Sequence, residues 1–72
     1  MLIVRSIDIM QRKEYTYTYE NGRIVRAAES DITLGANEVI TGKMLVNAIV
    51  YSYDANDKLT RKRILSADGN EQ

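Results

Sequence analysis

The segment from Tyr15 to Arg26 reads YTYTYENGRIVR and carries the clearest structural signal in the chain. Tyrosine and threonine alternate over Tyr15–Tyr19, so a period of two places the tyrosines on one face of a strand and the threonines on the other. The dipeptide Asn21-Gly22 accepts positive φ at both central positions of a type I′ turn. The segment therefore predicts a tight β-hairpin over residues 15–28, with Arg23–Ala27 as its return strand.

Strand and turn signals alternate in most of the remaining sequence. Leu2–Met10 alternates well enough to predict a first strand, and the apolar run Met44–Tyr53 predicts another. Asp54–Asp57 has turn composition, Lys58–Leu65 reads as the strand that returns from it, and a further turn is expected at Asp68-Gly69. These signals predict an all-β fold of antiparallel hairpins in a meander, formed by residues 1–72 as a single small module.

Residues 29–47 are less regular. Asp31–Leu34 and Glu38–Thr41 are expected to be short strands, broken at Gly35–Asn37 and at Gly42-Lys43. A helix over Ala36–Val46 is the alternative, which glycine and the β-branched residues in that range disfavour. The sequence favours strands here and leaves the helix open.

The composition argues against several classes of function. Ten Lys plus Arg balance ten Asp plus Glu, which argues against nucleic acid or an anionic membrane as the main partner. Histidine and cysteine are both absent, so the most common general base and the usual zinc ligands are missing. No apolar run is long enough to span a bilayer, and Met1–Asp8 does not have the form of a signal peptide. We predict no catalytic, cofactor-binding or metal-binding residue and do not expect an enzyme.

The carboxylates are assigned to turns and edges. Glu20, Asp54 and Asp57 lie where turns are predicted, and hydrogen bonds to backbone amides explain acidic residues there. Glu14, beside Arg12 and Lys13, is expected to be an exposed charge that discourages strand pairing.

The hairpin sequence recurs once. Tyr17–Arg26 aligns with Tyr51–Arg61, and Tyr53 follows Tyr19 by 34 residues. Each copy reads tyrosine, a small hydroxyl residue, tyrosine, an acid, a turn, a cation, an aliphatic residue, one further residue and an arginine. Such repetition predicts one β-hairpin unit used twice. The tyrosines are expected to form a buried, repeating core with the aliphatic residues.

The repeated pattern resembles the YD repeat, also called the RHS repeat, whose motif is Tyr-x-Tyr-Asp-x-x-Gly-Arg-Leu. The resemblance covers residues 15–28 and 50–70. It departs from the motif at Glu20, which replaces aspartate, and at Asp57, which replaces glycine. The residues expected to form the structural repeat core are Tyr17, Tyr19, Gly22 and Ile24 in the first copy and Tyr51, Tyr53, Asp54 and Leu59 in the second.

The resemblance implies a structural and interaction role. YD repeats occur in tandem in large secreted or cell-surface proteins, including bacterial polymorphic toxins, wall-associated proteins and teneurins, where hairpins form a β-sheet shell. The expected partners are neighbouring β-repeats of the same chain or another, including a homo-oligomer. The sequence ends where a further strand is due, so we expect a piece of a longer protein. The autoproteolytic core of the family is not visible, so no catalytic residue carries over.

Two other functions remain open. The tyrosine faces could stack carbohydrate, as in a cell-wall-binding module. A small β-barrel could bind nucleic acid through Tyr15–Tyr19 and Arg61–Arg63, although neighbouring residues of a strand point to opposite faces and divide that basic cluster.

Overall fold

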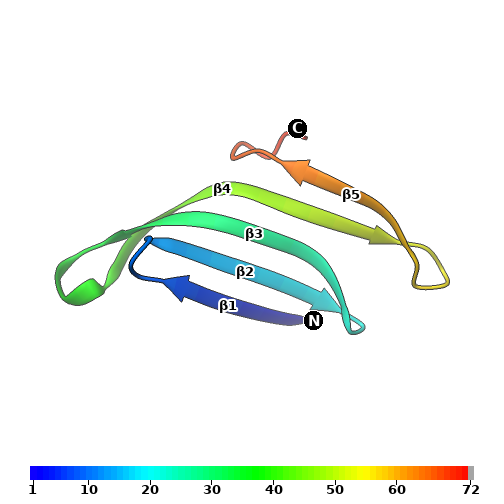
Figure 1. The fold of residues 1–72 in the computed structure, drawn as a ribbon, viewed down its shortest axis with the longest axis horizontal. Helices are drawn as coiled ribbons and strands as arrows, with labels where there is room; N and C mark the ends of the chain where they lie inside the picture. Colours follow the sequence, from blue (N-terminus) through cyan, green and yellow to red (C-terminus); the bar gives the residue numbers. More distant parts are fainter. Residues whose placement is uncertain (72) are drawn as a thin grey trace.

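The computed structural model describes residues 1–71 and contains one antiparallel sheet (Figure 1). Its order is β1-β2-β3-β4-β5, so every strand pairs with its neighbours in sequence. The strands are β1 (Leu2–Asp8), β2 (Lys13–Glu20), β3 (Arg23–Leu34), β4 (Ile40–Tyr53) and β5 (Leu59–Leu65). The predicted all-β antiparallel meander is confirmed.

The first hairpin forms where the tyrosine alternation and the Asn-Gly dipeptide predict it. Asn21 and Gly22 have φ values of 54° and 78°, as a type I′ turn requires at both central positions. The pairing of β2 with β3 runs back to Lys13 opposite Asp31, and β3 continues to Leu34. The hairpin is therefore longer than the sequence predicted.

The segment between β3 and β4 confirms the predicted break at Gly35–Asn37 and corrects the one at Gly42-Lys43. Asp31–Leu34 is the end of β3 and not a separate strand, and the chain turns through the short 3-10 element η1 (Ala36–Glu38). β4 begins at Ile40 and passes without a break through Gly42, which pairs with Thr33. Gly42 is tolerated in the ladder because its partner strand supplies the pairing on which the strand depends. The helix alternative for Ala36–Val46 is wrong.

Residues directly opposite each other on paired strands share a face of the sheet. One such row consists of Val4, Tyr17, Ala27, Ile49 and Ile64, one residue from each strand. We call the side of the sheet that carries this row the tyrosine face. The neighbouring row on the opposite face consists of Arg5, Thr16, Ala28, Ala48 and Leu65.

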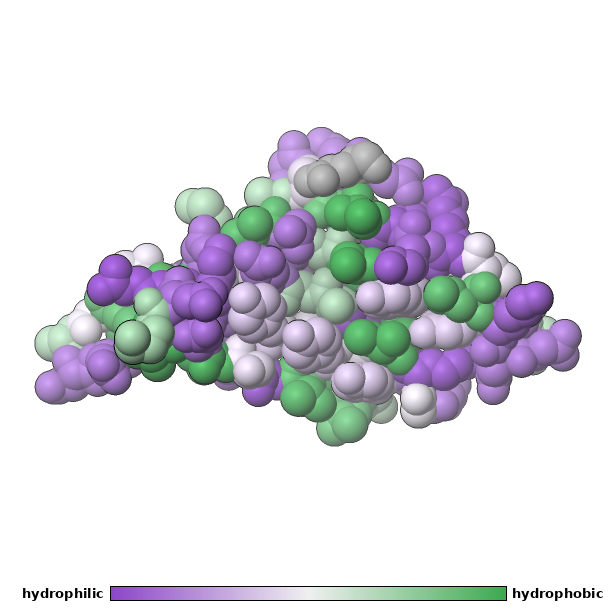
Figure 2. All heavy atoms as spheres, in the orientation of Figure 1, coloured by the Kyte–Doolittle hydropathy of each residue, from purple (hydrophilic) through white to green (hydrophobic). Residues whose placement is uncertain are grey.

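The sheet is a single layer, and little of it is buried. Within residues 1–71 the buried apolar side chains are Ala28, Ile32 and Ala48, and the principal extents are 48 × 25 × 16 Å. Figure 2 shows apolar and weakly polar side chains across the middle of one face, with hydrophilic ones gathered toward both ends. Apolar side chains therefore remain accessible to solvent or to a partner.

The expected tyrosine core is not buried. All four repeat tyrosines are half-buried, as is Ile24, and Leu59 is 46% exposed. The physical reason is the missing second layer, because an aromatic side chain standing on a lone sheet is covered only from below and from its sides.

Candidate functional site

The first repeat copy contains a β-bulge at its second tyrosine. Thr18 pairs with Arg26, whereas Tyr19 pairs with Ile24, so Val25 is the additional residue on β3. A bulge of this kind bends the strand and increases its local twist.

The second copy has the same bulge at the same motif position. Ser52 pairs with Arg61, whereas Tyr53 pairs with Leu59, so Thr60 is the additional residue on β5. The two copies thus agree in strand pairing as well as in sequence, with the second tyrosine opposite the aliphatic residue in each.

The turns of the two copies differ in length, but each reverses the chain with the help of residues at positive φ. In the second copy the Asp54 carboxylate accepts hydrogen bonds from the amides of Asn56 at 2.8 Å and Lys58 at 3.0 Å. Asp57, which stands at the glycine position of the motif, has a φ of 63°. Asp is among the few non-glycine residues that tolerate this left-handed conformation. Asp57 can therefore replace the glycine of the motif without loss of the turn.

The two copies contact each other through Tyr53. Its hydroxyl donates a 2.6 Å hydrogen bond to the Ile24 carbonyl oxygen, and the Arg23 guanidinium lies 5.0 Å from its ring centroid. Arg23 also forms an ion pair with Asp57. The end of the first hairpin is therefore joined to the end of the second.

A shallow groove lies on the tyrosine face above β3. Tyr15 and Tyr17 on β2 and Tyr51 on β4 line it, and Ala27 lies between them in its floor. Its volume is about 290 Å³, and its lining also includes Ala28, Glu29, Asn47 and Ile49. The small alanine on the central strand leaves the space that larger side chains on both neighbouring strands border.

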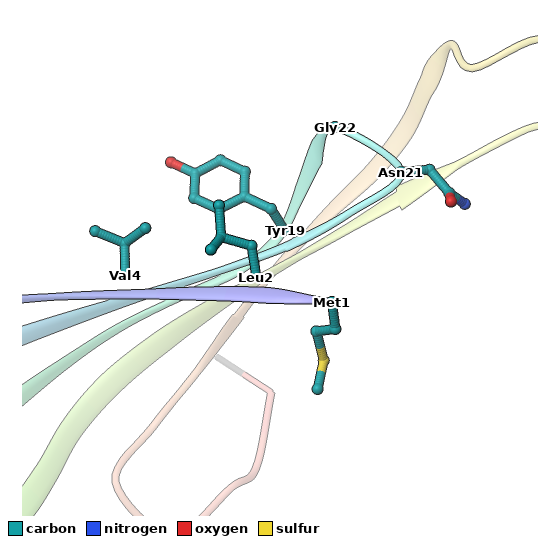
Figure 3. Close-up of a pocket in the computed structure, with 6 residues that line it drawn as sticks. All are labelled: Met1, Leu2, Val4, Tyr19, Asn21 and Gly22. Carbon is teal, nitrogen blue, oxygen red and sulfur yellow. The ribbon is translucent and has the colours of Figure 1, made fainter.

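A second and larger hollow lies over the start of β1 and the end of the first hairpin. It measures about 600 Å³ and is lined by Met1, Leu2, Val4, Tyr19, Asn21 and Gly22. Figure 3 shows Leu2, Val4 and Tyr19 projecting to one side of the sheet while Met1 points to the other. The hollow is wide open to solvent.

A buried carboxylate lies on the face opposite the tyrosines, and sequence reasoning placed it wrongly. Glu14 is 2% exposed, and its carboxylate lies 2.9 Å from Arg5 Nη2 and 3.1 Å from Lys43 Nζ. The Thr16 hydroxyl donates a further contact at 3.4 Å. Glu14 is thus not an exposed edge charge, because the cations that bury it come from β1 and β4, which sequence position does not bring near.

The pKa of Glu14 reflects two opposing effects. Burial disfavours the charged carboxylate and by itself would raise the pKa. Hydrogen bonds and charge from Lys43 and Arg5 outweigh this effect, so the pKa of Glu14 lies below its ordinary value of 4.5. Glu14 is therefore ionised at neutral pH and held in place.

Neither a metal site nor a membrane-spanning helix stands out. Residues 1–71 contain no group of three or more acidic side chains placed to hold a metal ion. Within the same residues, no helix has the length and apolar character needed to cross a bilayer.

No protein-family model matches the chain, and neither a curated protein nor a solved structure is significantly similar to it. The YD-repeat resemblance therefore depends on the residues and the pairing of the two hairpins.

Replacing Glu14 with Gln should destabilise the fold in a pH-dependent way. We expect E14Q to lower the free energy of unfolding at pH 7 by about 1–3 kcal/mol, because the charge-assisted hydrogen bonds weaken. Since the folded pKa lies below the unfolded one, the native carboxylate contributes stability above pH 4.5, and this contribution is lost as the pH falls through the folded pKa. Urea unfolding from pH 7 to pH 3 measures the difference between the two proteins.

The matched control is Glu29→Gln, which removes a half-exposed partner of Lys13 and should cost less than about 1 kcal/mol at pH 7. A gap between native protein and E14Q that stays constant down to pH 3 would contradict the assigned role of Glu14.

Replacing Tyr53 with Phe should lower stability by about 1 kcal/mol, because the Ile24 carbonyl oxygen loses its 2.6 Å hydrogen bond while the ring remains. Tyr51→Phe is the control, because the Tyr51 hydroxyl has no hydrogen-bond partner within residues 1–71 and its loss should change stability by less than about 0.5 kcal/mol. Chemical denaturation of both variants makes the comparison. Equal effects would show that this hydrogen bond between the copies contributes nothing.

Proposed function

We propose that this chain is a structural and interaction module of the YD-repeat type, belonging to a larger secreted or cell-surface protein. Its role is to pack β-hairpins against neighbouring β-units. The observation that carries the proposal is that the sheet is one layer thick and exposes apolar side chains on both faces.

An antiparallel sheet normally packs one face on a core and leaves the other to solvent. Here Leu2 and Ile64 are exposed on the tyrosine face, at 61% and 45%, and Ile3 is 55% exposed on the other. On the tyrosine face, the row from Val4 through Tyr17, Ala27 and Ile49 to Ile64 runs across the whole sheet. Contiguous apolar surface marks an interaction site in soluble proteins. A module that is completed by its neighbours explains why both faces retain such residues.

The two matching hairpins support a repeat. The bulges at Tyr19 and Tyr53 coincide in motif position, and Tyr53 bonds the backbone of the preceding unit. A contact that joins one unit to the next can be repeated along a tandem array, in which each unit is stabilised mainly by its neighbours.

The acidic side chains fit a structural role. Glu14 is held between two cations, Asp54 accepts bonds from turn amides, and Asp57 is paired with Arg23. A general base needs a carboxylate free to reach a proton on a substrate. These three carboxylates are instead engaged in contacts that stabilise strands and turns.

The isolated chain tests the proposal directly. At about 1 µM it should show a β-sheet circular dichroism spectrum, bind a hydrophobic dye such as ANS, and unfold below about 45 °C, the lower end of the range for mesophilic domains. The double variant Ile3→Thr/Ile64→Thr keeps β-propensity and should bind less dye. A native chain that binds no dye and unfolds above about 65 °C would contradict the proposal, because its single layer would need no cover.

Carbohydrate binding is a second candidate, and the groove over β3 favours it. Tyr15, Tyr17 and Tyr51 present aromatic rings beside Asn47, an arrangement that combines stacking surfaces with a hydrogen-bonding amide.

Titration with soluble peptidoglycan fragments, followed by tyrosine fluorescence, tests this candidate. We expect saturable binding that Tyr17→Ser reduces at least tenfold, the effect of losing about 1.4 kcal/mol of stacking. Tyr53 lies outside the groove, so the Tyr53→Phe variant should bind the fragments as the native chain does. No saturation, or equal binding by Tyr17→Ser, would eliminate this candidate.

A further inference from the structure

The two edges of the sheet differ in their protection. β5 carries Arg61, Lys62 and Arg63, and Glu71 forms a bridge with Leu65 and an ion pair with Arg61. Consecutive cations and a covering segment are common means of preventing strands from adding to an edge. The β5 edge is therefore protected against pairing with another strand.

The β1 edge lacks this protection. Leu2, Ile3, Val4 and Ile7 are 61%, 55%, 42% and 40% exposed, and they project to both faces. Its two charged residues are already occupied, because Arg5 pairs with Glu14 and the Asp8 carboxylate accepts a 3.1 Å hydrogen bond from the Gln11 amide. An exposed apolar edge strand of this kind is a template for pairing with another strand.

The side chains of Leu2 and Val4 at this edge are uncovered on the tyrosine face. The hollow of about 600 Å³ in Figure 3 follows Leu2 and Val4 and is bordered by Tyr19. The hollow lies over β1 and β2, inward of the edge, so it leaves Leu2 and Val4 free to contact the side chains of a strand added outside β1.

We propose that β1 pairs in antiparallel fashion with β1 of a second copy of this chain, with Val4 opposite Val4, forming one continuous ten-stranded sheet. The inference rests on the proposed packing function and names its first partner. The twofold axis passes between the two Val4 residues and perpendicular to the sheet.

The choice of register follows from the side chains that face each other. A twofold axis perpendicular to the sheet requires one residue to face its own copy, since only then do the two faces stay continuous. Centring on Arg5 places two guanidinium groups opposite each other, which is destabilising. Centring on Ser6 places Val4 opposite a charged Asp8, and centring on Ile3 pairs only Leu2–Val4.

Centring on Val4 leaves no such conflict. Leu2 faces Ser6 of the second copy on the tyrosine face, so both copies of Leu2 and Val4 form one apolar cluster. Ile3 faces Arg5 on the opposite face, where the aliphatic stem of arginine covers it while the guanidinium stays with Glu14. The surface is thus complementary to itself, which is the requirement for a symmetric dimer.

Disulfide trapping tests the register, because the native chain contains no cysteine. In the proposed dimer the two Val4 Cα atoms lie about 4.5–5.5 Å apart, within the range that a disulfide bridges. The two Ile3 Cα atoms are offset by two residues from direct opposition and lie about 8 Å apart, beyond that range. We expect Val4→Cys to form a covalent dimer under mild oxidation at least about tenfold faster than Ile3→Cys, at a concentration of about 100 µM suited to a small interface.

Sedimentation equilibrium tests the dimer without cross-linking. The native chain should be dimeric at about 100 µM, Val4→Lys should be monomeric, and Val39→Lys should stay dimeric. Val39 is the matched control because it is an exposed valine in the loop before β4, at 58% exposure against 42% for Val4. Circular dichroism checks that each variant is folded, and the cysteine pair remains decisive if Val4→Lys is not.

Three outcomes would overturn the dimer: a native chain that is monomeric at 100 µM, equal cross-linking of the two cysteine variants, or dissociation caused equally by Val39→Lys. The dye-binding and melting experiment at 1 µM examines the uncovered sheet below the concentration expected for dimerisation. A monomeric chain that still binds dye and melts early would therefore refute the second copy as partner and leave the packing function standing.

Discussion

A single β-sheet layer cannot bury its own side chains, and this constraint governs the structure. Packing two sheets or a helix against a sheet creates a core because side chains interdigitate between layers. Here many large apolar residues are exposed on either side, and the buried apolar residues within residues 1–71 are Ala28, Ala48 and Ile32. The sheet is then held together by the hydrogen bonds between its strands and by polar side-chain interactions across them.

Glu14 makes the most buried of these polar interactions. It sits on β2, but its partners Arg5 and Lys43 belong to β1 and β4, so one carboxylate links elements on both sides of β3. Both cations remain about half exposed, which limits the cost of removing charge from water. A charged cluster can therefore help to hold the register of an open sheet where no apolar core is present to do so.

Local signals in the sequence predicted the parts of the fold that depend on local geometry. The alternation of Tyr15–Tyr19 and the Asn21-Gly22 dipeptide located the first hairpin, because strand period and turn conformation are set by neighbouring residues. Gly42 misled because a glycine within a strand resembles a break until its cross-strand partner is known. Glu14 misled for the same reason, since Arg5 and Lys43 approach it only through pairing.

The half-buried tyrosines also show that local sequence signals do not reveal long-range contacts. Their alternation predicted a shared face, which the structure has, but whether a face is covered depends on a second layer, which residues 1–71 do not supply. The bulges at Tyr19 and Tyr53 twist both hairpins in the same manner, so a layer that matched one unit would also match the other. Repetition of the bulge thus gives the two hairpins the same pairing pattern at their second tyrosines. This shared pattern supports the packing function proposed above, with partners built from repeated β-units, over a site specialised for one small ligand.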